Sequence, residues 1–477
     1  MHPQYITVID AKGVSSIMRS ARAVQRAFHM GKFATAILNF SLRLPGTLGD
    51  RLREDWMREY FQEFARQPAH GADAVSPEAR AVLSFLRNEA GVAFEREWGR
   101  AHGLPVFYFG IGQRWVRGVK GQMHIMGSGA ERSLGHAMFT AAIEFVERFV
   151  LSVRSAGRSG DPFDFRAALA RSAMFRPAGT VPVAAPFRHE AERVDWWVPG
   201  RSLFSGEEVL LPAQKVLWDP DLTERSGEPR ICEQNTSGAA AGRTASDAKV
   251  FGICELVERD ALLFHWLKKI SPPRILPESV RDPEIDFLVE EARSRGLEPH
   301  LLDITTDIPV PAYMAVFVKK EPPTAFRGFS ANLDPRSAMK RALYEAWGSY
   351  VFNTLLPNDL DDPILARYRV WLQPSSFRHF EFLLKGPIVN FARSVATGEK
   401  RGELEILLEL FRARGPAYEL YWHESRHPIL ERLGLHVGKA VSAGLIPLYF
   451  FEESAKFALS HPRLRGVKLN TYPHPFG

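Results

Sequence analysis

The spacing of apolar and polar residues divides the chain near residue 104. Before that point, Ala21 to Leu44 and Asp50 to Arg66 repeat at helical spacing, and a break rich in turn-forming residues covers Gln67 to Pro77. Beyond it, segments of strand and helix character alternate. The pattern therefore predicts a mainly helical N-terminal extension over 1–104 and a core of strands and helices over 105–477.

The core carries further local expectations. Phe380 to Gly415 has helical character. Residues that favour strands are concentrated in Arg188 to Trp218, Pro299 to Lys319, Ala417 to Trp422 and Leu435 to Leu448. We therefore expect the fold class to be α/β, with helices and strands mixed as in α+β proteins.

One helix is expected over Ala245 to Trp266. Thr244, followed by Asp247 three residues later, forms the pattern of a capping box, and apolar residues then continue at helical spacing. Glu255 and Glu258 lie well inside this helix.

Two helical segments share the pattern Glu-x-x-Glu-Arg, at 144–148 and at 255–259. Glutamates three apart lie on one helix face, so each pair places two carboxylates within reach of one cation. Folding that brings the pairs together would make an all-oxygen site suited to Mg²⁺, which completes its shell with waters and phosphates. The repetition indicates an internal pseudo-repeat, each half giving one acidic helix to a shared nucleotide site. The alternative is two solvated faces with local Glu–Arg pairs.

A run of small residues from Asn235 to Thr244 precedes the second acidic helix. Small side chains let the backbone approach a ligand closely, and the free amides and dipole at a helix N-terminus favour phosphate. Together with the acidic helices, this run predicts a bound magnesium nucleotide.

Composition limits the class of protein. With 477 residues, 45% hydrophobic and 24% charged, the chain is globular. The net charge of +6 is spread without a long basic run, so a nucleotide or an acidic peptide is favoured over nucleic acid as a partner. Two cysteines, Cys232 and Cys254, exclude a disulfide framework. No secretory segment and no apolar run of about eighteen residues occurs, so we expect a cytoplasmic protein without a membrane span.

Several motifs, in order along the chain, resemble the YcaO superfamily. Residues 237–244 and 255–259 are similar to its ATP-binding core. Asp303 to Pro311 resembles the family's D-x-T-T-D-x-x-x-P segment, and Arg341 to Ala346 its third acidic helix. The ending, Tyr472 to Gly477, resembles the proline-rich tail of members that form azoline rings. The resemblance spans about residues 105–477.

The resemblance implies ATP-dependent activation of a peptide-backbone amide. In the ring-forming branch, a Cys, Ser or Thr side chain of a ribosomally made precursor peptide attacks the preceding carbonyl, and phosphorylation removes its oxygen, giving a thiazoline or oxazoline. ATP and Mg²⁺ are the implied cofactors. The alternatives are thioamide or amidine formation, or a non-catalytic scaffold subunit of a modification complex.

The resemblance also assigns roles to particular residues. The metal positions match Glu144, Glu255, Glu258 and Glu345. The nucleotide-site positions match Gln234, Thr236, Ser237, Arg259 and Arg341, with Glu147 as an addition. In the tail, the His474 imidazole and the terminal carboxylate of Gly477 are candidate acid–base groups.

Partners are implied in the same way: a precursor peptide, a leader-binding protein and a flavin-dependent dehydrogenase in one complex, and a second copy of this chain in a homodimer. No nucleic acid or membrane partner is expected. Residues 1–104 are either a structural extension or a docking surface for a partner or leader peptide.

The chain departs from the family pattern at three places. Ser128 stands where a Gly-Lys-Gly motif usually has its lysine, so a phosphate-facing lysine is missing. Trp347 to Ser349 occupies a place where many relatives have glutamine, and the tail ends in Gly477 instead of a third proline.

A competing motif, His423-Glu424-Ser425-Arg426-His427, fits the zinc-protease pattern H-E-x-x-H. That pattern requires a continuous helix, but Pro428 follows at once and disfavours helical geometry at the residue before it. The flanking residues predict a junction between a strand and a helix. A zinc hydrolase is therefore the least favoured alternative.

Overall fold

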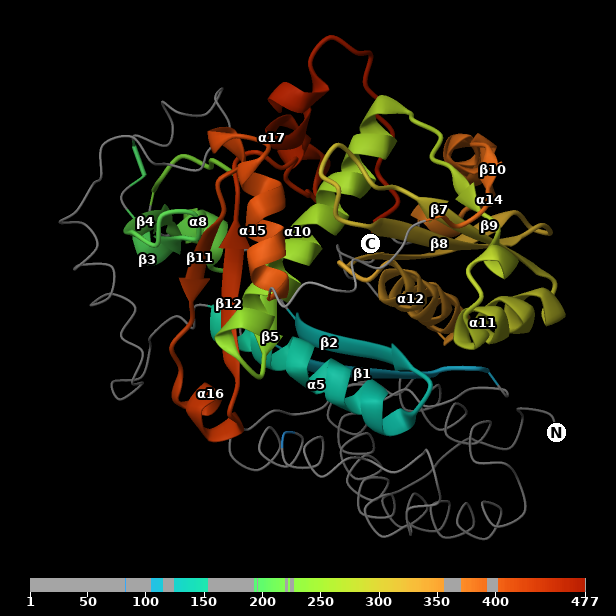
Figure 1. Cartoon of the computed structure of the whole chain (residues 1–477), viewed down its shortest axis with the longest axis horizontal. Helices are drawn as coiled ribbons and strands as arrows, with labels where there is room; N and C mark the ends of the chain where they lie inside the picture. Colours follow the sequence, from blue (N-terminus) through green and yellow to red (C-terminus); the bar gives the residue numbers. More distant parts are fainter. Residues whose placement is uncertain are drawn as a thin grey trace, which may run out of the picture.

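The fold consists of two five-stranded sheets, a separate β-hairpin and helices that pack between them (Figure 1). The structure, a computed structural model, describes residues 82, 104–114, 124–152, 193–194, 196–218, 222–223, 227–355, 370–392 and 402–476. The expected N-terminal extension over 1–104 lies outside these residues, apart from Val82 and Leu104, and remains a prediction.

The first five-stranded sheet has the order β10-β6-β7-β8-β9 and is antiparallel except for the β10–β6 pair. Its long strands lie on the right of Figure 1. The strands are β6 (Arg274–Ile275), β7 (Leu297–Asp303), β8 (Ala312–Lys319), β9 (Thr324–Ala331) and β10 (Ile388–Val389).

The second sheet has the order β4-β3-β11-β12-β5 and is antiparallel throughout. Segments from the middle and the end of the chain thus lie side by side in it. The strands are β3 (Trp197–Ser202), β4 (Glu208–Pro212), β5 (Ala239–Gly242), β11 (Tyr421–Glu424) and β12 (His436–Val441). The hairpin is formed by β1 (Phe107–Arg114) and β2 (His124–Glu131).

Three long helices carry the acidic motifs: α5 (Leu134–Leu151), α10 (Ala245–Lys268) and α12 (Pro335–Leu355). Helix α10 stands between the two large sheets and contacts strands of both (Figure 1). Helix α5 packs on the hairpin and on β5, and α12 packs on β8, β9 and the hairpin. The three helices therefore converge between the sheets.

Shorter helices complete the described part of the fold. They are α8 (Ala213–Val216), α11 (Pro283–Ser294), α14 (Pro374–Phe380), α15 (Glu403–Arg412), α16 (Pro428–Leu433) and α17 (Ala455–Leu459). The 3₁₀ turns within the described residues are η4 (Pro277–Ser279), η5 (Glu381–Lys385), η6 (Pro416–Tyr418), η7 (Glu452–Ser454) and η8 (Pro462–Leu464). None of the helices in the described part of the chain combines the length and apolarity of a bilayer crossing.

The α10 prediction is confirmed together with its cap. Thr244 accepts from the Asp247 amide while Asp247 accepts from the Thr244 amide, so two free helix donors are satisfied. At the other end, Lys269 adopts a left-handed conformation with φ 52°. Trp266 near this end is fully buried and meets Trp371 edge to face at 5.4 Å, which fixes the helix against the sheet core.

The helical expectation for Phe380 to Gly415 is only partly right. Helix α15 is present, but Pro387 interrupts the first half and β10 follows it. The Arg274 amide donates to the Pro387 carbonyl, and the Leu276 amide donates to the Val389 carbonyl. Pairing with β6, which local sequence does not reveal, overrides the helical pattern.

Candidate functional site

Each acidic helix presents one glutamate to a backbone amide of a neighbouring segment. These amides belong to β2, to the loop before β5 and to β9. The bonds are Ser128 N to Glu144 Oε2 at 2.5 Å, Gly238 N to Glu255 Oε2 at 2.6 Å, and Phe329 N to Glu345 Oε2 at 3.0 Å. A carboxylate held by an amide in this way has a fixed direction.

The first and third of these arrangements repeat each other closely. A Cβ at Gly127 would lie 2.1 Å from the Ala141 carbonyl oxygen, and a Cβ at Gly328 would lie 2.1 Å from the Ala342 carbonyl oxygen. In both cases the strand lies flat on its helix, and the donor to the glutamate follows the glycine. The predicted pseudo-repeat paired α5 with α10. That pairing stays a prediction, and the structure shows a further correspondence, between the hairpin–helix units β1-β2-α5 and β8-β9-α12.

Arg259 is the central cation of the site. Its guanidinium bonds Glu255 at 2.7 Å and Glu258 at 3.1 Å. The charges of Glu345 and Glu144 also raise its pKa against the effect of burial. Carboxylates from all three acidic helices therefore act on one guanidinium.

Burial, with mutual repulsion in some cases, raises the pKa values of several carboxyls in the site. Burial is the main cause for Glu258, whose pKa lies well above its usual range, and Glu345 and Glu255 add to the shift. Glu147 is raised well above its ordinary pKa by burial and then by Glu255. The Glu345 side chain is open to solvent, yet enough protein surrounds it that burial raises its pKa to about 7. Such a cluster of carboxyls calls for a cation.

Of two other arginines near the acidic helices, one pairs with a glutamate of its own helix and one acts on glutamates of two helices. Arg148 pairs with Glu144 at 2.5 Å, as the alternative of local Glu–Arg pairs predicted. Arg341 is exposed, and its charge lowers the pKa values of Glu258 and Glu345.

The small-residue loop lies beside Glu255. Asn235 Oδ1 accepts from the Ser237 amide at 3.0 Å, and the Thr236 carbonyl accepts from the Ala239 amide at 2.8 Å. The Ser237 hydroxyl is buried and has no hydrogen-bond partner among the described residues. Gln234 is not brought into the acidic group in the described contacts: its amide bonds the Leu217 carbonyl at 3.4 Å, at the end of α8.

Lys439 was not among the site residues predicted from the sequence. This residue lies on β12 with 3% of its surface exposed and donates to the Asn235 carbonyl. Burial lowers its pKa to about 8, although the charges of Glu255 and Glu147 oppose the shift. A lysine inside an apolar strand between Val437 and Val441 was the available signal, because lysine is almost never buried without a partner.

The donors suit a magnesium nucleotide. In the described part of the chain, no three carboxylate, histidine or thiol groups are already arranged to hold a metal ion. Two of the carboxylates, Glu255 and Glu258, are paired with the Arg259 guanidinium. All the site's anionic donors are oxygens, which favours Mg²⁺ over zinc. The unpartnered Ser237 hydroxyl is a donor that a phosphate oxygen would satisfy.

The C-terminal tail is anchored next to the site. Trp266 Nε1 donates to the Tyr472 carbonyl at 3.0 Å, and Trp371 Nε1 donates to the His474 carbonyl at 3.1 Å. The Phe476 ring lies 4.0 Å from the Arg259 guanidinium carbon, measured to the ring centre. The tail thus reaches the cation that joins the acidic helices.

His474 is fully buried. One ring nitrogen contacts the Tyr449 carbonyl, and the other accepts from the Phe476 amide at 3.3 Å. The ring therefore holds the tail, and a proton-transfer role would require it to give up one of these contacts. Gly477 lies outside the described residues.

The H-E-x-x-H motif does not form a helix. His423 and Glu424 belong to β11, and His427 is the N-cap of α16, where its side chain accepts from the Ile429 amide. His423 bonds the Pro199 carbonyl at 2.7 Å. The predicted strand-to-helix junction is confirmed.

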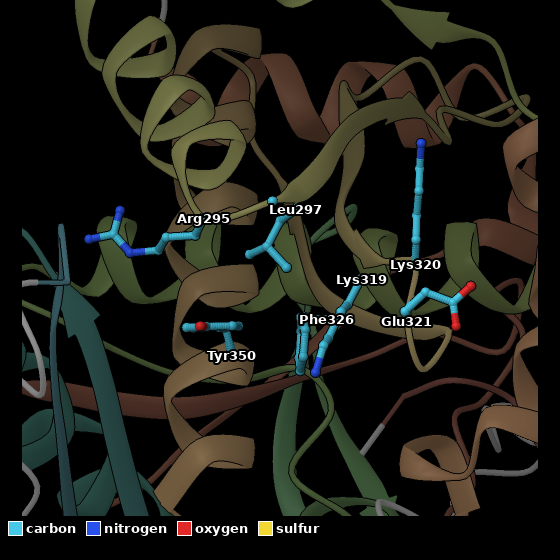
Figure 2. A pocket seen from close by; sticks show the side chains of 8 residues that line it. Arg295, Leu297, Lys319, Lys320, Glu321, Phe326 and Tyr350 are labelled. Carbon is cyan, nitrogen blue, oxygen red and sulfur yellow. The ribbon is translucent and has the colours of Figure 1, made fainter.

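Figure 2 shows a separate pocket of about 380 Å³ beside the turn between β8 and β9. None of its lining residues belongs to the acidic group. They are Arg295, Gly296, Leu297, Lys319, Lys320, Glu321, Phe326 and Tyr350. Arg295 is paired with Glu291 at 2.5 Å and Lys320 with Glu298 at 3.2 Å, so two of its three cations already have partners.

The fold and the acidic helices are those expected of a protein that binds a magnesium nucleotide. Comparisons with known proteins identify the family. Residues 126–446 match the family described as YcaO cyclodehydratase, ATP- and Mg²⁺-binding. The match covers more than half of the chain, and the chain belongs to the YcaO family. The expected fold class and the ATP and Mg²⁺ cofactors are thereby confirmed for this family.

Solved structures support the same fold. A heterocyclase in complex with substrate and cofactor matches with a TM-score of 0.58 and 20% identity, covering 78% of this chain and 53% of that one. YcaO from Methanopyrus kandleri bound with AMPPCP and Mg²⁺ matches with a TM-score of 0.55 and 21% identity, covering 77% of this chain and 91% of that one.

Curated relatives match over parts of their length. An uncharacterized protein in the tfuA 3′ region of Rhizobium leguminosarum bv. trifolii is 38% identical over 125 residues, which is 26% of this chain and 29% of that protein. The Escherichia coli microcin B17-processing protein McbD is 26% identical over 197 residues, which is 39% of this chain and 49% of McbD.

Proposed function

We propose that the protein is an ATP-dependent cyclodehydratase that converts Cys, Ser or Thr residues of a ribosomally synthesised precursor peptide into thiazolines or oxazolines. The observation that carries the proposal is the meeting of three acidic helices and the C-terminal tail at Arg259. A nucleotide site and a stiff tail in contact suit a reaction that joins ATP to a peptide. Family membership and the name of the relative McbD support this choice.

The proposed reaction balances as follows. The side-chain Sγ or Oγ forms a bond to the preceding carbonyl carbon and loses its proton, and the carbonyl oxygen becomes a hemiorthoamide oxygen. That oxygen takes the terminal phosphoryl group of ATP, and ADP leaves. The amide nitrogen then forms a C=N bond and loses its proton as phosphate departs. The peptide loses one water, whose oxygen ends in phosphate.

The chain's contribution is positioning and charge, as in other phosphoryl transfers. Glu144, Glu255, Glu258 and Glu345 would hold Mg²⁺, which neutralises and orients the triphosphate when bound. The Arg259 guanidinium must leave at least one glutamate to admit a metal ion, and a phosphate oxygen is its natural new partner.

A second group of residues would contact the nucleotide. Arg341 is exposed and would meet phosphates, and the Ser237 hydroxyl lacks a partner among the described residues. Thr236 precedes it in the same loop, and Glu147 extends the acidic face toward Glu255. Gln234 has the weakest support because its amide points to α8.

The tail would position the peptide. Its two prolines remove donors and restrict the backbone, and its anchors bring Phe476 to Arg259. We propose that His474 fixes this path and that the Gly477 carboxylate, just beyond Phe476, supplies the acid–base group.

Partners follow from the proposed chemistry. A precursor peptide is the substrate, and a leader-binding protein and a flavin-dependent dehydrogenase would deliver it and oxidise the rings. Residues 1–104 are the proposed docking region. A homodimer remains part of the proposal.

The test uses the purified chain, MgATP, a short Cys-, Ser- and Thr-rich peptide encoded beside its gene, and a leader-binding protein if one is encoded there. Phosphate release should require both Mg²⁺ and peptide, and each ring should lower the peptide mass by one water. Replacement of oxygen by sulfur in the product would instead identify thioamide formation. Neither phosphate release nor a mass change would favour a scaffold.

A further inference from the structure

Lys439 occupies an unusual position for a charged residue. It lies in β12 between β11 and β5, opposite His423 on one side and Ala239 on the other. Only 3% of its surface is exposed, and its neighbours Val437, Ala440 and Val441 are buried apolar residues. Because burying an ammonium group is costly without partners, its surroundings indicate what the charge is for.

Those surroundings are the small-residue loop. The Lys439 ammonium donates to the Asn235 carbonyl, and the next residue, Ala440, donates its amide to the Gly238 carbonyl at 2.8 Å. The Asn235 side chain donates to the Leu448 carbonyl at 2.8 Å. Strand β12 and the segment after it therefore hold both ends of the loop that carries the unpartnered Ser237 hydroxyl.

The charge of Lys439 also acts on the acidic helices. Glu255 of α10 and Glu147 of α5 are among the groups that interact electrostatically with it. A fixed positive charge behind these carboxylates favours an anionic triphosphate nearby and opposes a divalent cation. Its effects on nucleotide and on metal thus have opposite signs.

We propose that Lys439 is a positioning residue for the nucleotide: its ammonium group fixes the Asn235–Gly238 loop and supplies from β12 the positive charge that Ser128, in place of the usual lysine, does not. The inference rests on the magnesium nucleotide site proposed above. It assigns a role to a strand far from the acidic motifs in sequence.

The test compares Lys439→Gln, which keeps a donor for the Asn235 carbonyl but loses the charge, with Lys439→Met, which loses both. Removing a buried charge relieves a desolvation cost, so Lys439→Met should fold. Lys215→Met is the matched control, because Lys215 is a half-buried lysine whose charge acts on Cys232, as that of the buried Lys439 does. A thermal melt checks folding of each variant.

Calorimetric titration with a non-hydrolysable ATP analogue and Mg²⁺ gives the nucleotide affinity. Both Lys439 variants should bind about 10- to 100-fold more weakly, Met more than Gln, and the control within about twofold of wild type. At saturating nucleotide, the Mg²⁺ concentration for half-maximal binding should not rise, because the lost charge opposed the metal.

Three results would overturn the inference: unchanged nucleotide affinity in the folded Lys439 variants, an equal loss in Lys215→Met, or a parallel rise in the Mg²⁺ requirement, which would show collapse of the acidic site. If the wild-type chain binds no magnesium nucleotide, the proposed function fails first and the inference falls with it.

Discussion

Replacing Glu255 by glutamine should weaken nucleotide binding strongly and change the free energy of unfolding only slightly. The Glu255 carboxylate accepts from the Gly238 amide at 2.6 Å and from Arg259 at 2.7 Å. Glutamine offers one oxygen and can keep only one of these bonds. Losing the other bond and the half-buried ion pair costs on the order of 1 to 2 kcal/mol.

Part of that cost is offset. Burial already raises the pKa of Glu255, and its charge repels Glu147 and Glu258, so a neutral side chain relieves both penalties. The unfolding free energy should therefore change by about 1 kcal/mol or less. Mg²⁺-dependent nucleotide binding should fall much further, by at least about 10- to 100-fold, since loss of even an outer contact to a metal site has effects of that size.

The assay is calorimetric titration with Mg²⁺ and a non-hydrolysable ATP analogue, with a denaturant melt for stability. Glu291→Gln is the matched control, because Glu291 forms the same kind of pair, with the arginine four residues on, at 2.5 Å on α11. It should lose stability slightly and bind nucleotide normally. Unchanged nucleotide affinity in folded Glu255→Gln would show that Glu255 does not help to bind the magnesium nucleotide. The carboxylates would then form only a solvated helix face.

Three further predictions concern other parts of the chain. Deleting Pro473 to Gly477 should suppress ring formation far more than nucleotide affinity; equal yields from the truncated and full-length proteins would reduce the tail to a frayed end. Changing His423 and His427 together should leave activity intact, and stoichiometric zinc by elemental analysis, lost in this variant, would contradict the assignment. Burial lowers the pKa of His461 to about 4, below the roughly 6.5 of an unfolded chain, so protonation favours unfolding as the pH falls from 6.5 toward 4. Across that window the free energy of unfolding should fall by up to about 3 kcal/mol, and the melting temperature should fall with it. The fall should be smaller in His461→Asn. Identical pH profiles of the two proteins would show that another group is responsible.

The features predicted correctly from the sequence were those set by residues close together along the chain. The capping residues Thr244 and Asp247 and the helical spacing after them located α10, with Glu255 and Glu258 inside it. Pro428 was enough to exclude a continuous helix through the H-E-x-x-H motif. These features depend on neighbours within a few residues, where propensity and capping act directly.

The features that the sequence did not predict depend on contacts between segments that are distant along the chain. Gly127 and Gly328 reveal their equivalence only when each strand lies on its helix. Lys439 meets the Asn235 carbonyl 204 residues away, and no local pattern specifies that contact. Strand β10 forms within an expected helix because β6 supplies a partner. Tertiary pairing decided each of these features.

The central claim is that this chain activates a peptide amide oxygen with ATP, and an isotope experiment tests it most directly. The proposed precursor peptide is made with heavy oxygen in the backbone carbonyl that precedes a modified Cys, Ser or Thr, and is incubated with the chain, the proposed leader-binding protein and MgATP. Each ring formed should transfer one labelled oxygen to inorganic phosphate, with ADP as the other product. Ring formation with unlabelled phosphate, or phosphate release while the label stays in an unchanged peptide, would contradict the central claim.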